Sequence, residues 1–135
     1  MPTVTWRDEY LVNVAVIDVQ HQEMLDRVNK LHASVEARVE KPVLEEMLVE
    51  LVKFTRSHFL TEETLMKEHE YPNLPCHYKE RRMLLQHMDY LVKNVSSGKY
   101  PTFFSDYDVS SDWALDHMSN CDKALGAFLN SKGVY

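Results

Sequence analysis

The stretch from Pro42 to His69, PVLEEMLVELVKFTRSHFLTEETLMKEH, decides the fold. Its apolar residues recur every three or four positions, which predicts an amphipathic helix with one buried stripe. Lys41 and Pro42 suit a helix start, because proline disfavours helix in the residue before it and is accommodated in a first turn. The stripe consists of Leu44, Met47, Leu48, Leu51, Val52, Thr55, Phe59 and Met66. Other helices are needed to cover it.

Three further helices are predicted from the same periodicity. The first runs from Asp18, a plausible N-cap, to about Val39. The third begins near Pro75, after a break at 71–75 that contains two prolines, and ends at Ser96-Ser97-Gly98. A polar and aromatic loop at 99–109 follows. Ser110 or Ser111 then caps a fourth helix that runs through Leu129.

The first residues, Thr3 to Val16, predict an extended arm rather than a helix. Trp6, Tyr10, Val12 and Val14 supply its apolar anchors, and nothing nearby can pair with it as a strand. We therefore expect a loop laid along the core. With four long helices and short connections, the chain is predicted to be all-α, a single domain over 1–135 folded as an up-down-up-down four-helix bundle with an extended N-terminal arm.

Composition excludes several classes of function. Lys and Arg number 15 against 21 Asp and Glu, a net charge of −6, so nucleic acid and anionic membranes are poor partners. No apolar run approaches the about 18 residues of a membrane span. Gly-rich phosphate loops are excluded, because the chain has only 3 glycines. Two cysteines form no disulfide framework, so Cys76 and Cys121 are interpreted as small hydrophobes in a reducing cytoplasm.

Histidines are distributed over all four predicted helices. Each helix supplies at least one imidazole, and two helices add a nearby carboxylate: the candidate ligands are His21, His58, Glu62, His77, His117 and Asp122. Spaced i, i+4, His58 and Glu62 share one helix face. Bundle cores hold two-metal sites built from such inward groups, and imidazole with carboxylate suits iron, zinc or manganese.

Spacing alone leaves other interpretations open. A pair such as His58 and Glu62 is more often a solvated helical pair. On an ideal helix Asp122 lies about 140° from His117, whereas Cys121, at i+4, is better aligned. Periodicity therefore also allows a zinc site with Cys121, or a buried thiol.

In order along the chain, the motifs resemble those of the bacterial hemerythrin family. They are Trp6-x3-Tyr10-x-Val12-x-Val14-x2-Ile17-Asp18-x-Gln20-His21, Phe54-x3-His58-Phe59-x2-Glu62-Glu63-x-Leu65-Met66, Tyr71-Pro72-x4-His77 and Trp113-x3-His117-x4-Asp122. The match covers roughly Trp6 to Leu129.

This resemblance implies a non-haem di-iron centre that binds O2 reversibly, with an oxo or hydroxo bridge. One iron takes His21 and His58, and has an open position for O2. The other takes His77 and His117. Glu62 and Asp122 bridge the two ions, so the resemblance favours Asp122 over Cys121 and implies a widened turn or π-bulge after His117. Trp113 and Ala114 are candidates for the wall of an O2 pocket.

The third helix departs from the family pattern His-x3-His. Here the residue four positions after His77 is Arg81, whose guanidinium has no lone pair to give a metal. The second iron therefore loses a ligand, and one iron instead of two becomes an alternative. Because a buried cation beside metal ions is costly, we expect Arg81 to swing outward or to pair with Glu80 or Glu62.

The resulting hypothesis is an O2-binding protein for storage, delivery or sensing, and not an enzyme. O2 is the expected partner, and no protein partner is identified by the sequence. Alternatives are a peroxide- or NO-reactive di-iron enzyme, which Arg81 and an extra open position would favour, and a metal-poor bundle used for protein contacts.

Overall fold

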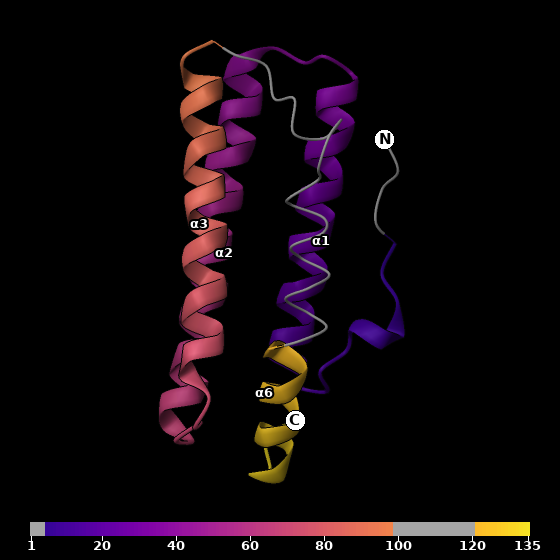
Figure 1. Cartoon of the computed structure of the whole chain (residues 1–135). Helices are drawn as coiled ribbons and strands as arrows, with labels where there is room; N and C mark the ends of the chain where they lie inside the picture. Colours follow the sequence, from indigo (N-terminus) through magenta and orange to yellow (C-terminus); the bar gives the residue numbers. More distant parts are fainter. Residues whose placement is uncertain (1–4, 99–120) are drawn as a thin grey trace.

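The computed structural model describes residues 5–98 and 121–135, and within these ranges it is helical without strands. A short 3-10 helix, η1 (Asp8–Tyr10), precedes α1 (Ala15–Glu36), α2 (Lys41–Glu68), α3 (Leu74–Ser96) and α6 (Cys121–Ser131). Successive long helices alternate in direction, up, down, up and down (Figure 1). The prediction of an all-α up-down-up-down bundle is confirmed. The predicted loop at 99–109 and the predicted start of the fourth helix lie outside the described residues.

Both α1 and α2 end where a residue other than glycine adopts the left-handed conformation. In α1, Arg38 has φ 54°, and the Val39 N–H donates to the Ser34 carbonyl at 3.2 Å. After α2, Glu70 has φ 55°, and the Tyr71 N–H donates to the Met66 carbonyl at 2.9 Å. Both are Schellman motifs. The predicted end of the first helix at Val39 is therefore three residues too late.

Asp18 is not the N-cap that we predicted. Val14 holds that position, and α1 begins at Ala15. The Asp18 carboxylate instead accepts hydrogen bonds from the backbone N–H groups of Val12, at 2.8 Å, and Asn13, at 3.1 Å. It satisfies donors of the arm rather than those of its own helix, because the arm folds back over the first turn. Asp18 thus fastens the arm to α1.

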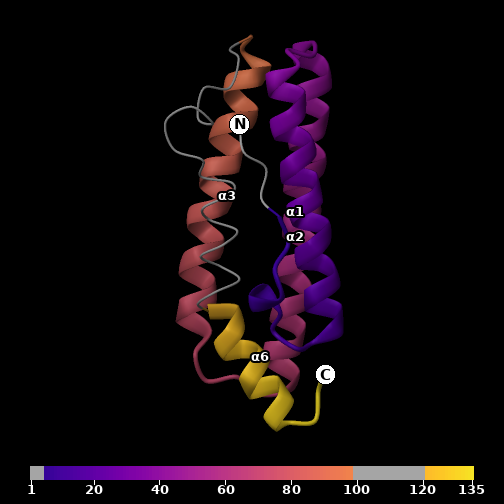
Figure 2. The same cartoon turned by 90° about the vertical axis from the view of Figure 1, so that its right-hand side faces the viewer.

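The arm passes along the side of the bundle to the start of α1 (Figure 2), as predicted. It ends at Val14, two residues earlier than expected, and contains the short helix η1. Its Tyr10, Val12 and Val14 side chains are buried. Gly126 of α6 meets the arm so closely that a Cβ there would lie 2.3 Å from the Val12 carbonyl oxygen. The Asn130 side-chain amide also donates to the Asn13 carbonyl at 3.0 Å. The arm therefore joins α1 to α6.

Within the described residues, the core divides into two apolar clusters. The larger one joins α1, α2 and α3 in the half of the bundle toward the α1–α2 turn, and includes Leu31, Leu48 and Leu91. The smaller one joins the arm, α1, α2 and α6 at the opposite end, and includes Ile17, Met66 and Leu125. Polar side chains occupy the layer between the two clusters.

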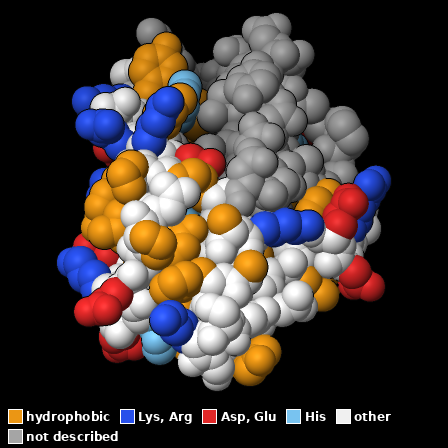
Figure 3. Space-filling model, turned by 60° about the horizontal axis from the view of Figure 1, so that its bottom comes forward, with side chains coloured by type: hydrophobic (Ala, Val, Ile, Leu, Met, Phe, Trp, Pro, Cys, Tyr) orange, Lys and Arg blue, Asp and Glu red, His pale blue; other side chains and the backbone are white. Residues whose placement is uncertain are grey.

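The surface of the bundle end mixes apolar, basic and acidic side chains (Figure 3). Larger exposed apolar residues include Val19 and Leu60, at 66% and 63% exposure. Among the described helices, none is both long and apolar enough to cross a membrane.

Substitution of Gly126 by alanine tests the contact between the arm and α6. On helix propensity alone this change stabilises a helix by about 1 kcal/mol. Because the new Cβ would overlap backbone of the arm, we expect destabilisation by about 1–3 kcal/mol instead. Urea unfolding of Gly126→Ala measures the sign. Ala127→Gly, at the neighbouring exposed position, calibrates the propensity effect. A more stable Gly126→Ala protein would contradict the contact.

Candidate metal centre

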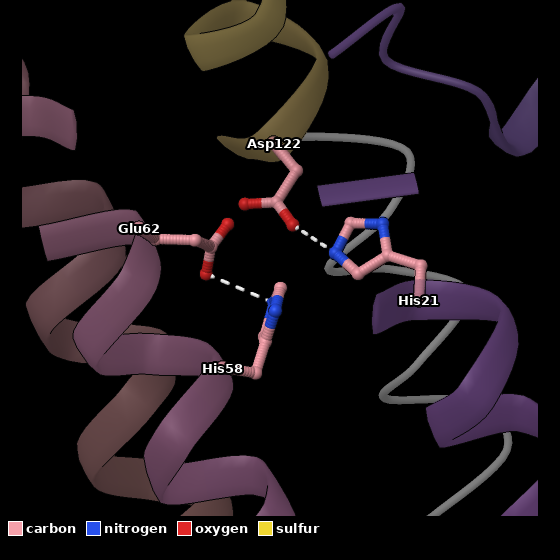
Figure 4. Close-up of side chains that lie close together, drawn as sticks. All are labelled: His21, His58, Glu62 and Asp122. Atoms are coloured by element: carbon pink, nitrogen blue, oxygen red, sulfur yellow. Dashed lines mark ion pairs between the residues drawn. The ribbon is translucent and has the colours of Figure 1, made fainter. Parts of the chain in front are cut away.

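Four buried side chains from three helices converge in the polar layer (Figure 4). His21 comes from α1, His58 and Glu62 from α2, and Asp122 from α6. Their candidate ligand atoms all lie within 4.8 Å of one another, and each residue is at most 1% exposed. The structure thus brings together four of the six predicted metal ligands.

Each carboxylate in this cluster faces one imidazole. Asp122 Oδ2 lies 2.6 Å from His21 Nε2, and Glu62 Oε1 lies 3.1 Å from His58 Nε2. The two imidazole rings meet edge to face, with 4.8 Å between their centroids. Burying carboxylates is costly unless partners or cations offset the charge. The four groups therefore form a compact donor set that is shielded from bulk solvent.

Gln20 orients one of the imidazoles, and sequence reasoning missed this role. Its Oε1 lies 2.8 Å from His58 Nδ1, and its Nε2 donates to Thr61 Oγ1 at 3.1 Å. An amide oxygen can only accept, so His58 Nδ1 carries the hydrogen. His58 Nε2 is then the ring nitrogen that faces the cluster and is available to a cation, which is how outer groups orient metal-binding histidines. No local sequence pattern could identify it, because Gln20 and His58 are 38 residues apart.

His77 lies at the edge of the cluster. Its Nδ1 is 3.5 Å from Asp122 Oδ1, and its side chain is 3% exposed. The ring of Tyr71 contacts it edge to face at 5.8 Å. Burial, with a smaller effect from the Asp122 carboxylate, raises the pKa of the Tyr71 phenol. Tyr71 therefore stays protonated beside His77. The predicted ligand His117, the pocket candidates Trp113 and Ala114, and the π-bulge all lie outside the described residues.

The alternative ligand Cys121 points elsewhere. Its sulfur forms a disulfide with Cys76 of α3, across a Cα–Cα distance of 6.1 Å. The interpretation of these cysteines as separate small hydrophobes is therefore wrong. It failed because 45 residues separate them in sequence, and only the packing of α3 against α6 brings them together.

Arg81 does not enter the cluster. Its Nη1 donates to Glu63 Oε2 at 3.1 Å and its Nη2 to the Phe59 carbonyl at 3.2 Å. The guanidinium also packs over the rings of Phe59 and Tyr78, at 5.3 and 5.2 Å. Arg81 pairs with a carboxylate, as expected, but the partner is Glu63 instead of Glu80 or Glu62. Glu63 lies one residue beyond Glu62 along α2, toward the outside of the bundle, where it is 23% exposed.

The donor set fits a transition-metal cation. Neutral imidazole nitrogens with carboxylate oxygens suit iron, manganese or zinc, and a set without sulfur does not select soft ions. Two carboxylates would also offset much of the charge of divalent ions in this dry layer. The fold and the cluster define a helical-bundle protein with a buried cation-binding centre.

Comparison with known proteins gives the family. The chain belongs to the hemerythrin HHE cation-binding domain family, whose model matches residues 12–129. It is similar to bacteriohemerythrin from Methylococcus capsulatus, with 29% identity over 97% of this chain and all of that protein. Bacteriohemerythrin from Stenotrophomonas maltophilia is 26% identical over 92% of this chain and 80% of the relative. The crystal structure of wild-type hemerythrin matches with a TM-score of 0.82 and 28% identity, over 95% and 98% of the two chains.

The pairing of Arg81 with Glu63 predicts a pH-dependent contribution to stability. Hydrogen bonds from Lys67 first, and from Arg81 second, lower the pKa of Glu63. A lowered carboxyl pKa stabilises the fold above the ordinary glutamate range, and this effect is lost as the pH falls through the folded-state pKa. Glu63→Gln should therefore unfold more easily than the native chain near pH 7, by less than about 1 kcal/mol because the pair is partly exposed.

Chemical unfolding at a series of pH values measures this difference, which should vanish in acid. Glu68→Gln, which removes an exposed carboxylate near the C-terminal end of the same helix, is the control and should not reproduce it. A Glu63→Gln deficit that persists unchanged in acid would show that packing, not charge, holds Arg81.

Proposed function

We propose that this protein binds O2 at a non-haem di-iron centre in the middle of the bundle. The observation that carries the proposal is the buried cluster of two imidazoles and two carboxylates in a chain of the hemerythrin family. Storage, delivery and sensing of O2 are all compatible with such a centre, and catalysis is not needed to account for it.

The candidate ligands divide between two ions. His21 and His58 would hold one iron, His77 and His117 the other, and Glu62 and Asp122 would bridge them. Iron in this site would supply reversible O2 binding. The chain supplies the charge of the two carboxylates, the fixed orientation of His58 through Gln20, and a layer closed by apolar clusters on both sides. Exclusion of water protects a reactive centre from side reactions.

Arg81 removes one expected ligand from the iron position beside His77. It lies one turn after His77 on α3, so a histidine there would share the His77 face. Arg81 cannot ligate, and its guanidinium is held by Glu63 and the Phe59 carbonyl. The iron beside His77 would thus have one protein ligand fewer than its counterpart in the family pattern, and we propose that it is bound more weakly.

Metal analysis combined with O2 titration tests the proposed function. We expect about two irons per chain after expression with ample iron, as the donor sets suggest. The reduced protein should gain a visible absorption band with O2 and lose it under vacuum over several cycles. His58→Ala should abolish both. An iron-loaded protein that consumes peroxide or NO catalytically without reversible O2 binding would favour an enzyme, and a folded protein without metal would favour an interaction bundle.

Arg81→His tests whether position 81 weakens the second iron. During dialysis against a chelator, the native chain should lose the iron beside His77 early, because that position lacks the third imidazole of the family pattern. Arg81→His should retain both. Arg56→His is the matched control, since Arg56 and Arg81 line one surface pocket together, but Arg56 lies on α2 and is exposed. Equal iron loss from Arg81→His and the native chain would contradict this account.

A further inference from the structure

A second group of metal-binding side chains lies outside the cluster described above. It consists of Cys76 and Glu80 of α3 and Cys121 of α6, and one ligand atom from each lies within 4.8 Å of the others. Cys76 and Glu80 are half-buried, and Cys121 is buried. In the structure the two sulfurs form a disulfide. This group shares no residue with the imidazole–carboxylate cluster.

The backbone around these residues is compatible both with a disulfide and with a pair of cysteine ligands on one cation. Cys76 and Glu80 are spaced i, i+4 and lie on one face of α3. The Cα atoms of the cysteines are 6.1 Å apart, within the range found for disulfides. A tetrahedral zinc with Zn–S bonds of about 2.3 Å holds two thiolate sulfurs about 3.8 Å apart. Small side-chain movements therefore convert the cross-linked pair into a pair of ligands, without displacement of either helix.

We propose that Cys76, Glu80 and Cys121 form a redox-gated site for one thiophilic divalent cation of the Zn²⁺ type. Reduced, the two thiolates and the Glu80 carboxylate hold the cation, with water as a fourth ligand. Oxidised, the disulfide joins α3 to α6 and the cation leaves. Two sulfurs and one carboxylate select softer ions than the imidazole–carboxylate cluster does.

A low-molecular-weight disulfide is the oxidant that balances the change. One thiolate attacks it and forms a mixed disulfide, releasing one small thiolate. The thiolate of the other cysteine then attacks the protein sulfur of this mixed disulfide. The Cys76–Cys121 bond forms, and the other small thiolate is released. Two electrons pass from the cysteines to the reagent, and the cation is freed. Cys76 is the accessible attacking group, since it is half-buried and Cys121 is buried.

Titration of the full chain with Cd²⁺ alone tests the site. The protein is stripped of metal, reduced with a phosphine and transferred to anaerobic buffer. Thiolate sulfur bound to Cd²⁺ gives an ultraviolet charge-transfer band, which imidazoles and carboxylates do not give. We expect the band to saturate at one cation per chain, and a low-molecular-weight disulfide to abolish it and release the Cd²⁺. Because the readout needs neither iron nor O2, it is independent of the proposed function.

Variants assign the ligands. Cys76→Ser should lose most of the band, and Glu80→Gln should weaken Cd²⁺ binding by at least about tenfold. Asp89→Asn, which removes another carboxylate from α3, should bind as the native chain does. Circular dichroism on the same samples verifies folding. A folded, reduced chain without the band would overturn the site, and a native affinity in Glu80→Gln would overturn the role of Glu80.

Discussion

Burial of two carboxylates beside two imidazoles, in a layer closed by apolar clusters, is the constraint on which the rest of the structure depends. Charge in such a layer is tolerated only when partners meet it at close range. The partners come from α1, α2 and α6, so the register of all three helices is set by one small volume. The apolar stripes determine which face of each helix points inward. The polar layer determines the position of each helix along the bundle axis relative to the others.

The sequence predicts most of the fold because helix periodicity is repeated over long segments. The end of α2 and the start of α3 followed from the same pattern and from two prolines. Helix ends that depend on a left-handed residue such as Arg38 carry a weak signal in sequence, because such a conformation is commonest for glycine. Asp18 was misread for a similar reason: an acidic residue near a helix start suits several donors, and only the folded arm shows which it meets.

The residues of the candidate site differ in how well the sequence alone predicts them. His58 and Glu62 share a helix turn, so their convergence is a local property. Asp122 could not be separated from Cys121 by periodicity, and the family pattern favoured the one that the structure brings into the cluster. Gln20 and the Cys76–Cys121 disulfide depend on contacts between helices distant in sequence, which no local pattern encodes. Arg81 illustrates the same limit. Its partner is Glu63, which neighbours the expected Glu62 in sequence but lies on a different side of α2.

The position of α6 connects these features. Cys121 and Asp122 are neighbours, so the link to Cys76 and the approach to His21 act on the same turn of helix. Further along, Gly126 lies against the Val12 backbone, and Asn130 donates to the Asn13 carbonyl. The arm that receives these contacts is in turn fastened to α1 by Asp18. The position of Asp122 is therefore fixed by a closed ring of contacts that runs from α6 to α3, to the arm and to α1. Because His77 directly follows Cys76, the same contacts also place His77 Nδ1 at 3.5 Å from Asp122 Oδ1.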